Sequence, residues 1–222
     1  MAKNNRATLV KADLPAAATA PAAPVSTTAV TGSTTANSIG ANAEPQQGGS
    51  ARQLQAGREA LAQAQSLWNA GSHDAASELL QQALVLAERT AGSSPTGANA
   101  QLLATLAREQ ARMQIANSRP QAALDGLSRL ESYLGQDADA WALRGNAAQR
   151  LGRHQDSVRA YTAALQIRPN EQRWLLGAAV SQAALGQAAN ASELAAKARA
   201  LGPISKEVQS YLRQSGVSLS EP

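Results

Sequence analysis

The chain has 222 residues, with 20 Lys and Arg against 16 Asp and Glu, no Cys, no Phe and few aromatic residues. The absence of Cys excludes disulfides, thiolate nucleophiles and Cys-based metal sites, and the formal net charge of +4 is scattered without a basic run, so no nucleic-acid partner is expected. No apolar stretch reaches the roughly 18 residues of a membrane span, and the abundance of Ala and Gln favours helices over strands.

Residues 1–49 are rich in Ala, Pro, Thr, Ser, Asn and Gly, without the apolar period of a helix or a strand. Such a segment buries too little apolar surface to offset the entropy that it would lose on ordering. We therefore predict a disordered linker over residues 1–49, which holds the following domain away from an anchor. The alternative is a recognition peptide, but no charged or aromatic anchor recurs in the segment.

A different pattern begins at Ser50, where "SARQ" predicts a capping box with Ser50 as the N-cap and Gln53 at the third helical position. From there to Arg213, segments of helical periodicity alternate with short breaks, and no segment alternates like a strand. The breaks are predicted at Gly71-Ser72, 91–99, 117–120, 135–137, Gly152, Pro169-Asn170, Gly186 and Gly202-Pro203. The sequence therefore predicts an all-α domain over residues 50–215.

The spacing of the breaks repeats. "LGRHQDSVRAYTAALQIRP" at residues 151–169 is followed 34 residues later by "LGQAANASELAAKARALGP" at 185–203. A period of 34 residues with two helices in each unit is typical of tetratricopeptide repeats. The unit of residues 138–171 resembles that family's pattern most closely. Its matching residues are Trp141, Gly145, Gly152, Ser157, Tyr161, Ala164 and Pro169, whereas Arg144 and Ala148 depart from the pattern.

Four units fit this register. They span about 57–90, 104–137, 138–171 and 172–205, and an insertion of about 13 residues separates the first two. In the second unit Ser118 replaces the turn glycine. Val208, Tyr211 and Leu212 form an apolar stripe on a short predicted helix at about 205–214, which would cap the stack. The resemblance implies a right-handed α-solenoid of about four helix pairs with a C-terminal capping helix, preceded by a disordered N-terminal arm.

Small residues recur in the units because paired helices must approach closely. A larger side chain at Gly145 or Ala164 would force the two helices apart. Gly and Pro recur because each pair needs the same turns. Packing therefore constrains these positions, and the other surface positions are free to vary.

No catalytic motif is present. His73 and His154 both fall at position 17 of their units, so their spacing is that of the repeat, and no second ligand lies near either in sequence. We therefore expect packing or surface roles for both histidines, no enzyme activity, no metal and no cofactor. Trp68, Trp141 and Trp174 lie in first helices and are predicted core residues, although Trp68 borders the groove.

The resemblance implies that first helices line a concave groove that binds a peptide or protein partner. The side chains expected there are Arg58, Gln65, Trp68, Asn69, Arg108, Arg112, Asn146, Arg150 and Arg173. Converging arginines suit an acidic peptide or a terminal carboxylate. The alternative is that these arginines are solvated and bind nothing. Asn146 matches the peptide-binding Asn of the family, but the other units depart from it.

The sequence therefore predicts a non-catalytic scaffold for protein–protein interaction. "RWLLGAAVSQAALG" and "YLRQSGVSL" also resemble segments of bacterial pilus-biogenesis and secretion-assembly proteins, such as the tetratricopeptide proteins of MSHA-pilus biogenesis. That likeness implies a periplasm-facing or inner-membrane-associated location if an anchor precedes this sequence, and a cytoplasmic one otherwise. The alternative is a homo-oligomer, a subunit that self-associates through an apolar stripe of Leu54, Leu61 and Trp68.

Overall fold

The computed structural model describes residues 44–91 and 97–219, with side chains from 51 to 89 and from 97 to 219. These ranges contain helices and no strand, which confirms the predicted all-α class. Of the linker predicted over residues 1–49, residues 1–43 lie outside the described residues. The helices are α1 (Glu44–Asn69), α2 (His73–Ala91), α3 (Gly97–Ala116), α4 (Pro120–Arg129), α5 (Glu131–Leu134), α6 (Ala138–Arg150), α7 (His154–Ile167), α8 (Gln172–Ala184), α9 (Ala188–Leu201) and α10 (Lys206–Gln214).

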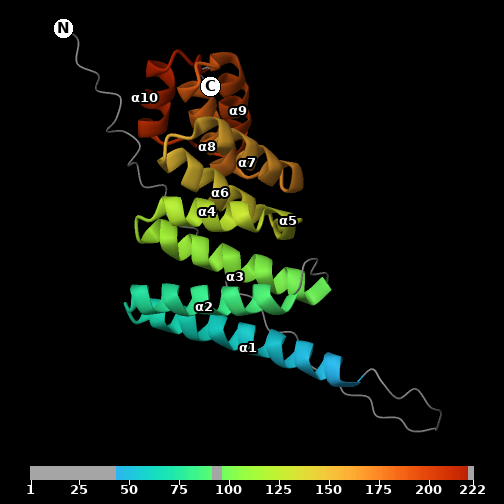
Figure 1. Ribbon diagram of the computed structural model, residues 1–222. Helices are drawn as coiled ribbons and strands as arrows, with labels where there is room; N and C mark the ends of the chain where they lie inside the picture. The colour runs from blue at the N-terminus through green and yellow to red at the C-terminus, as the bar shows by residue number, and fades with distance from the viewer. Residues whose placement is uncertain (1–43, 92–96, 220–222) are drawn as a thin grey trace, which may run out of the picture.

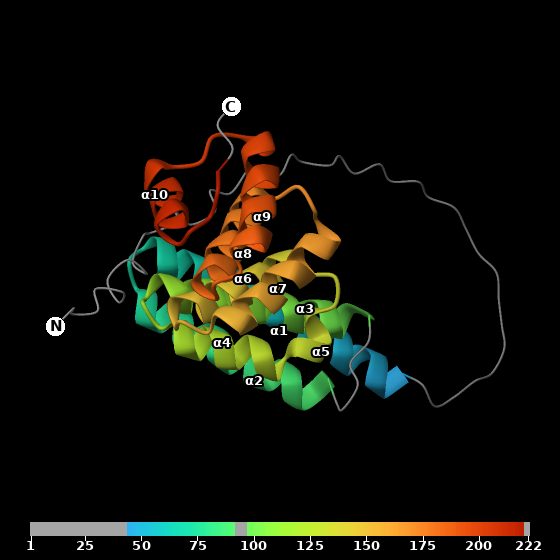
Figure 2. The same ribbon diagram turned by 90° about the horizontal axis from the view of Figure 1, so that it is seen from above.

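The helices stack in adjacent pairs, as the predicted solenoid requires (Figure 1). The pairs are α1 with α2, α3 with α4, α6 with α7 and α8 with α9, and each pair packs on the next. Seen from above, the pairs overlie one another with a progressive rotation (Figure 2). The capping helix α10 packs on α8, the first helix of the last pair.

The turn inside each pair places one residue in the left-handed region of backbone space. Gly71, Gly152 and Gly186 have φ of 83°, 71° and 75°, and Ser118 has φ of 58° at the equivalent place in the second unit. Glycine takes this conformation without a steric penalty, whereas a side chain with a Cβ is strained. Ser118 therefore does replace the turn glycine, at some cost in stability.

Two predicted boundaries were wrong. Helix α1 begins at Glu44, so Ser50 lies inside the helix and is not its N-cap. Pro45 falls in the first turn, where the missing N–H has no intrahelical partner to lose. The predicted break at 91–99 is shorter than expected, because Gly97 to Asn99 belong to α3. The short helix α5 was not predicted, since it is a single turn before Gly135.

The core changes character along the stack. One cluster of buried side chains extends from Ala64 on α1 to Ala148 on α6 and contains most of the leucines. Beyond it the clusters are smaller and richer in alanine. In this second part the buried ring of Tyr161 lies against Gly145 of its own unit and Gly177 of the next, where any Cβ would approach it to 3.0 Å or less. Close approach of the helices therefore depends on those two glycines.

The predicted cap is present. Ser205 is the N-cap of α10, and its side chain accepts a hydrogen bond from the Val208 N–H at 3.4 Å. Leu212 is fully buried and packs with Ala179 and Ala183 of α8. The chain then turns back, and the Ser192 hydroxyl of α9 donates to the Ser218 carbonyl at 2.6 Å. The last pair is thus covered on its outer side.

Candidate interaction groove

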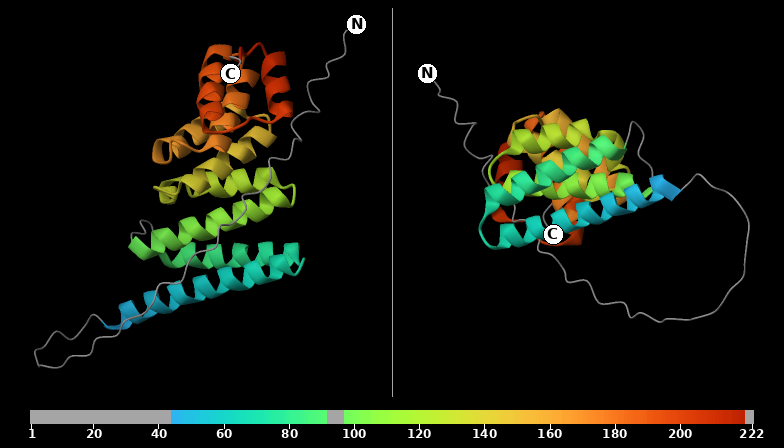
Figure 3. Two further views of the ribbon diagram at one scale, coloured as in Figure 1. Left: turned by 180° about the vertical axis from the view of Figure 1, so that it is seen from behind. Right: turned by 60° about the horizontal axis from the view of Figure 1, so that its bottom comes forward.

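The first helices of successive pairs contact one another in series, α1 with α3, α3 with α6 and α6 with α8. We call the surface formed by these four helices the first-helix face. Figure 3 shows the same succession of pairs from behind and from below. All of the predicted groove residues lie on these helices, and none of them is buried. The four first helices therefore follow one another along the stack, and each predicted groove residue lies on one of them with some exposed surface.

On α1 the predicted residues are mostly exposed. The side chains of Arg58, Gln65 and Asn69 are all open to solvent. Trp68 is half-buried: it packs against the core, and its ring stacks on His73 with centroids 4.2 Å apart and planes 21° apart. Trp68 thus packs against the core, as expected, and also forms a stacked aromatic pair with the exposed His73.

Arg108 and Arg112 of α3 meet at one carboxylate that sequence reasoning missed. Arg112 Nη2 lies 2.6 Å from Glu109 Oε2, and Arg108 Nε lies 3.7 Å from Glu109 Oε1. Arg108 also pairs with Asp137, at 2.9 Å between Nη1 and Oδ2. The spacing of four residues did predict a shared helix face. It did not predict that carboxylates of the chain itself would already pair with both guanidinium groups.

Asn146 and Arg150 of α6 are also brought together, at 3.1 Å from Arg150 Nε to Asn146 Oδ1. The ring of Tyr161 on α7 is buried next to the same helix, against Gly145. Burial raises the pKa of Tyr161 well above its ordinary value of 10.0, and Asn146 and the Arg150 charge oppose that rise. Arg173, by contrast, is exposed on the first turn of α8.

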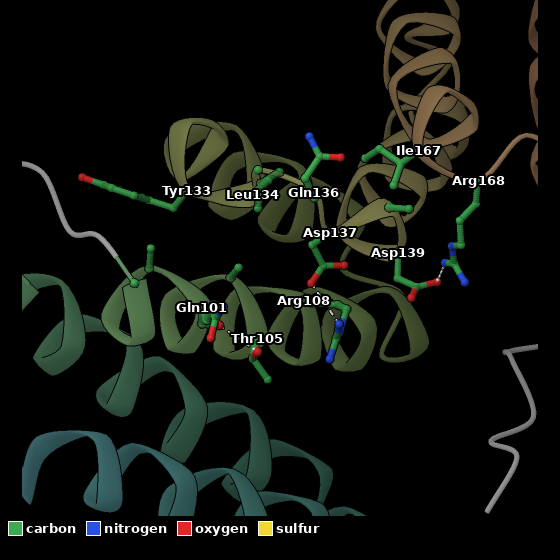
Figure 4. Close-up of a pocket in the computed structure, with 15 residues that line it drawn as sticks. Gln101, Thr105, Arg108, Tyr133, Leu134, Gln136, Asp137, Asp139, Ile167 and Arg168 are labelled. Atoms are coloured by element: carbon green, nitrogen blue, oxygen red, sulfur yellow. Dashed lines mark hydrogen bonds and ion pairs between the residues drawn. The ribbon is translucent and has the colours of Figure 1, made fainter. Parts of the chain in front are cut away.

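A hollow of about 620 Å³ lies at one edge of the stack, away from most of the predicted residues (Figure 4). It is lined by the first half of α3, by residues 133–139 and by Ile167 and Arg168 at the end of α7. Its four charged side chains pair among themselves, Arg108 with Asp137 and Arg168 with Asp139. Asp137 also caps α6 by accepting a hydrogen bond from the Ala140 N–H at 3.0 Å. These four charged side chains therefore have partners within the protein.

The histidines have the packing and surface positions expected of them. His73 is exposed, and His154 is half-buried at the first residue of α7. Burial lowers the pKa of His154 below its ordinary value of 6.5. Among the described residues, no group of three or more His, Cys, Asp or Glu side chains could hold a metal ion. No helix in the described ranges is both long and apolar enough to span a bilayer.

Comparisons with known proteins agree with this architecture. Residues 138–171 match the family model for the tetratricopeptide repeat, and no curated protein matches the chain. A tetratricopeptide repeat protein from Parabacteroides merdae aligns with a TM-score of 0.58 at 18% identity, over 73% of this chain and 60% of that one. The chain thus spans 60% of the length of that protein, and at this identity the likeness concerns the fold alone.

Two MamA structures align more loosely. MamA AMB-1 has a TM-score of 0.45 at 19% identity, over 72% of this chain and 97% of that one. MamA MSR-1 has a TM-score of 0.43 at 19% identity, over 68% and 96%. These scores are too low to carry an inference. The chain therefore contains a tetratricopeptide repeat at residues 138–171, within a stack of helix pairs whose fold is similar to that of a solved tetratricopeptide repeat protein.

Proposed function

We propose that the protein is a non-catalytic scaffold that binds a peptide or protein partner on its first-helix face. The observation that carries the proposal is the continuity of that face: four first helices contact in series, and every predicted groove residue on them retains exposed surface. A surface of this kind suits a long ligand better than a small molecule, because contacts can be added along several helices.

The chemistry of this face supports a mixed polar and aromatic partner more than a strongly acidic one. Arg108 and Arg112 already pair with Asp137 and Glu109, so an acidic ligand would have to compete with those carboxylates. Gln65 and Asn69 offer amide donors and acceptors beside the partly exposed Trp68 ring. Arg58, which is exposed on α1, is an arginine that an acidic segment would reach without displacing either of those carboxylates.

Selection from random peptides tests the proposal and needs no identified partner. Peptides displayed on phage would be selected on the full chain and then measured against two variants with equal changes in charge. The groove variant carries Arg58→Glu, Gln65→Glu and Asn69→Glu on α1. The control carries Gln82→Glu, Arg89→Glu and Gln166→Glu on second helices, where these side chains are exposed. Both variants must keep the helical circular dichroism of the parent chain.

We expect the groove variant to lose the selected peptides and the control to retain them. Equal retention by both variants would exclude the α1 part of the first-helix face as the site. Loss in the control alone would place binding on the second helices. A strongly acidic consensus among the retained peptides would restore the acidic partner that the paired arginines disfavour.

Self-association through α1 is the second candidate. It requires an exposed apolar stripe on α1, and the structure exposes that stripe only in part. Leu54, Leu61 and Trp68 are each partly buried, and the latter two pack against the core. The exposed large apolar side chains of the described residues are Leu86 and Leu201, on α2 and α9. We therefore expect a monomer in analytical ultracentrifugation, and a concentration-dependent dimer lost in Trp68→Ala would reinstate self-association.

The role in pilus or secretion assembly stays a prediction from sequence resemblance. It is tested by the position of the gene, because assembly proteins of this kind are encoded beside their partners. Pilus or secretion genes on both sides would support it, and an unrelated neighbourhood together with normal assembly after deletion of the gene would contradict it.

A further inference from the structure

The two halves of the array bury different types of side chain. Among the described residues, ten large apolar side chains are fully buried, and nine of them lie between Leu80 and Leu134. Beyond Leu134, the fully buried side chains are alanines and two serines until Leu212 of the cap, and the larger buried side chains of this part, Tyr161, Leu175, Leu176 and Ile204, each keep 3 to 7% of their surface exposed. Each unit of a repeat protein is stabilised by its interface with its neighbours, so the composition of an interface sets how readily it opens.

Ion pairs also favour the first half. Asp74 with Arg119 and Glu88 with Arg129 join the first unit to the second. Glu131 with Arg144 joins the second unit to the third, and Arg108 pairs with Asp137, the N-cap of α6. Most of these pairs are partly exposed, so each contributes little alone. Together they add directional contacts to junctions that leucines already fill.

The junction between the third and fourth units has a polar centre. Gln149 Nε2 of α6 donates to the Gly177 carbonyl at 3.0 Å and to Ser181 Oγ at 3.1 Å, both on α8. Ser157 Oγ of α7 lies 2.9 Å from the same Ser181 Oγ. We call these four residues the polar junction. Hydrogen bonds of this kind add little net stability, because water replaces them when the junction opens.

Two buried polar side-chain atoms of the described residues have no hydrogen-bond partner, and both lie on helices of this junction. They are His154 Nδ1 on α7 and Gln182 Oε1 on α8. A buried acceptor without a partner favours any state in which water reaches it. Contacts at the other end of the junction are apolar, since Tyr161 and Leu165 of α7 pack toward α8. The junction is thus weakest at its polar end.

We propose that α8, α9 and α10 open together from the rest of the array at the polar junction, and that they do so more often than α1 to α4 open. The cap binds this unit as one piece, because Leu212 and Val217 pack with alanines of both α8 and α9. Opening would separate Asn146 and Arg150 on α6 from Arg173 on α8. That consequence for partner binding rests on the proposed function, whereas the opening itself does not.

Native-state hydrogen exchange of the full chain, followed by mass spectrometry at rising denaturant, tests the proposal. We expect peptides from α8, α9 and α10 to share one opening free energy that is lower than that of α2 to α4. Equal opening free energies in the two halves would overturn the proposal. So would exchange of α10 alone ahead of α8 and α9, since that pattern is simple fraying of the end.

A disulfide across the junction gives a matched control. The chain has no Cys, so Ser157→Cys with Ser181→Cys creates a single possible bridge, at a place where the two hydroxyl oxygens are 2.9 Å apart. Relative to the reduced form of the same variant, we expect oxidation to slow exchange in α8 to α10 on the order of tenfold or more and to leave α2 to α4 unchanged. Equal slowing in both halves, or none in α8 to α10, would refute local opening.

Discussion

Replacing Gly177 by Ala tests whether the close approach of the third and fourth units depends on a glycine. A Cβ at this position would lie 2.5 Å from Tyr161 Cζ, 2.6 Å from Cε2 and 2.8 Å from the hydroxyl oxygen. Carbon atoms in contact prefer about 3.5 to 4.0 Å, so the ring or the helix must move by roughly 1 Å. The ring is 3% exposed, and Gly145 lies against its other side. It therefore has no free space to enter.

The magnitude follows from two opposing effects. Ala in a helix interior is favoured over Gly by about 1 kcal/mol, whereas overpacking a filled core costs about 1 to 3 kcal/mol. We expect a net loss of up to about 2 kcal/mol and a fall in Tm of roughly 2 to 8 °C, measured by differential scanning calorimetry. Gly126→Ala in α4 is the control, because its Cβ meets no atom within 4 Å; it should raise Tm.

A double variant separates the clash from other effects of the substitution. In a Tyr161→Leu background the atoms that the new Cβ meets are absent, so Gly177→Ala should become neutral or stabilising. If Gly177→Ala raised Tm in the parent chain as much as Gly126→Ala does, the ring would not fix the spacing of these units, and the dependence on glycine would be refuted.

Three further predictions concern the turn, the acid response and the cap. Ser118→Gly should raise the free energy of unfolding in urea by about 1 kcal/mol, because it removes a strained left-handed serine; an unchanged or lower value contradicts the strain. Burial lowers the pKa of His154, so the unfolded chain binds the proton more tightly, and stability should fall as pH decreases below about 6.5. His154→Gln should flatten that part of the profile, and an unaltered slope would show that another group causes it. Leu212→Ala should cost about 2 to 5 kcal/mol and speed hydrogen exchange in α8; normal protection of α8 would show that the cap is dispensable.

Much of the fold could be predicted because its signals are local. Gly71, Gly152 and Gly186 mark turns that need a positive φ, and helical periodicity fills the segments between them. The start of α1 was missed because Gly48 and Gly49 indicate a break that the helix tolerates. Gly177 was missed because the repeat register assigns the small position of that helix to Ala179, and both residues are buried.

The candidate site was less predictable because its decisive contacts join distant residues. Repeat register predicts Arg108 and Arg112 in the groove, and in the structure both lie on α3 with part of the side chain exposed. Whether the charge of Arg108 is available depends on Asp137, which is 29 residues away and meets it only because α3 and α6 pack side by side. Arg112 pairs instead with Glu109, three residues before it. Tyr161 of α7 likewise meets Gly177, 16 residues further along the chain, only because α7 and α8 pack together. Local patterns carry no information on such pairings.

The measurement that tests the central claim most directly is hydrogen exchange of the full chain with and without a selected peptide bound. We expect slower exchange in α1, α3, α6 and α8, with α2, α4, α7 and α9 unchanged. Protection of the second helices, with the first helices unaffected, would contradict a partner site on the first-helix face.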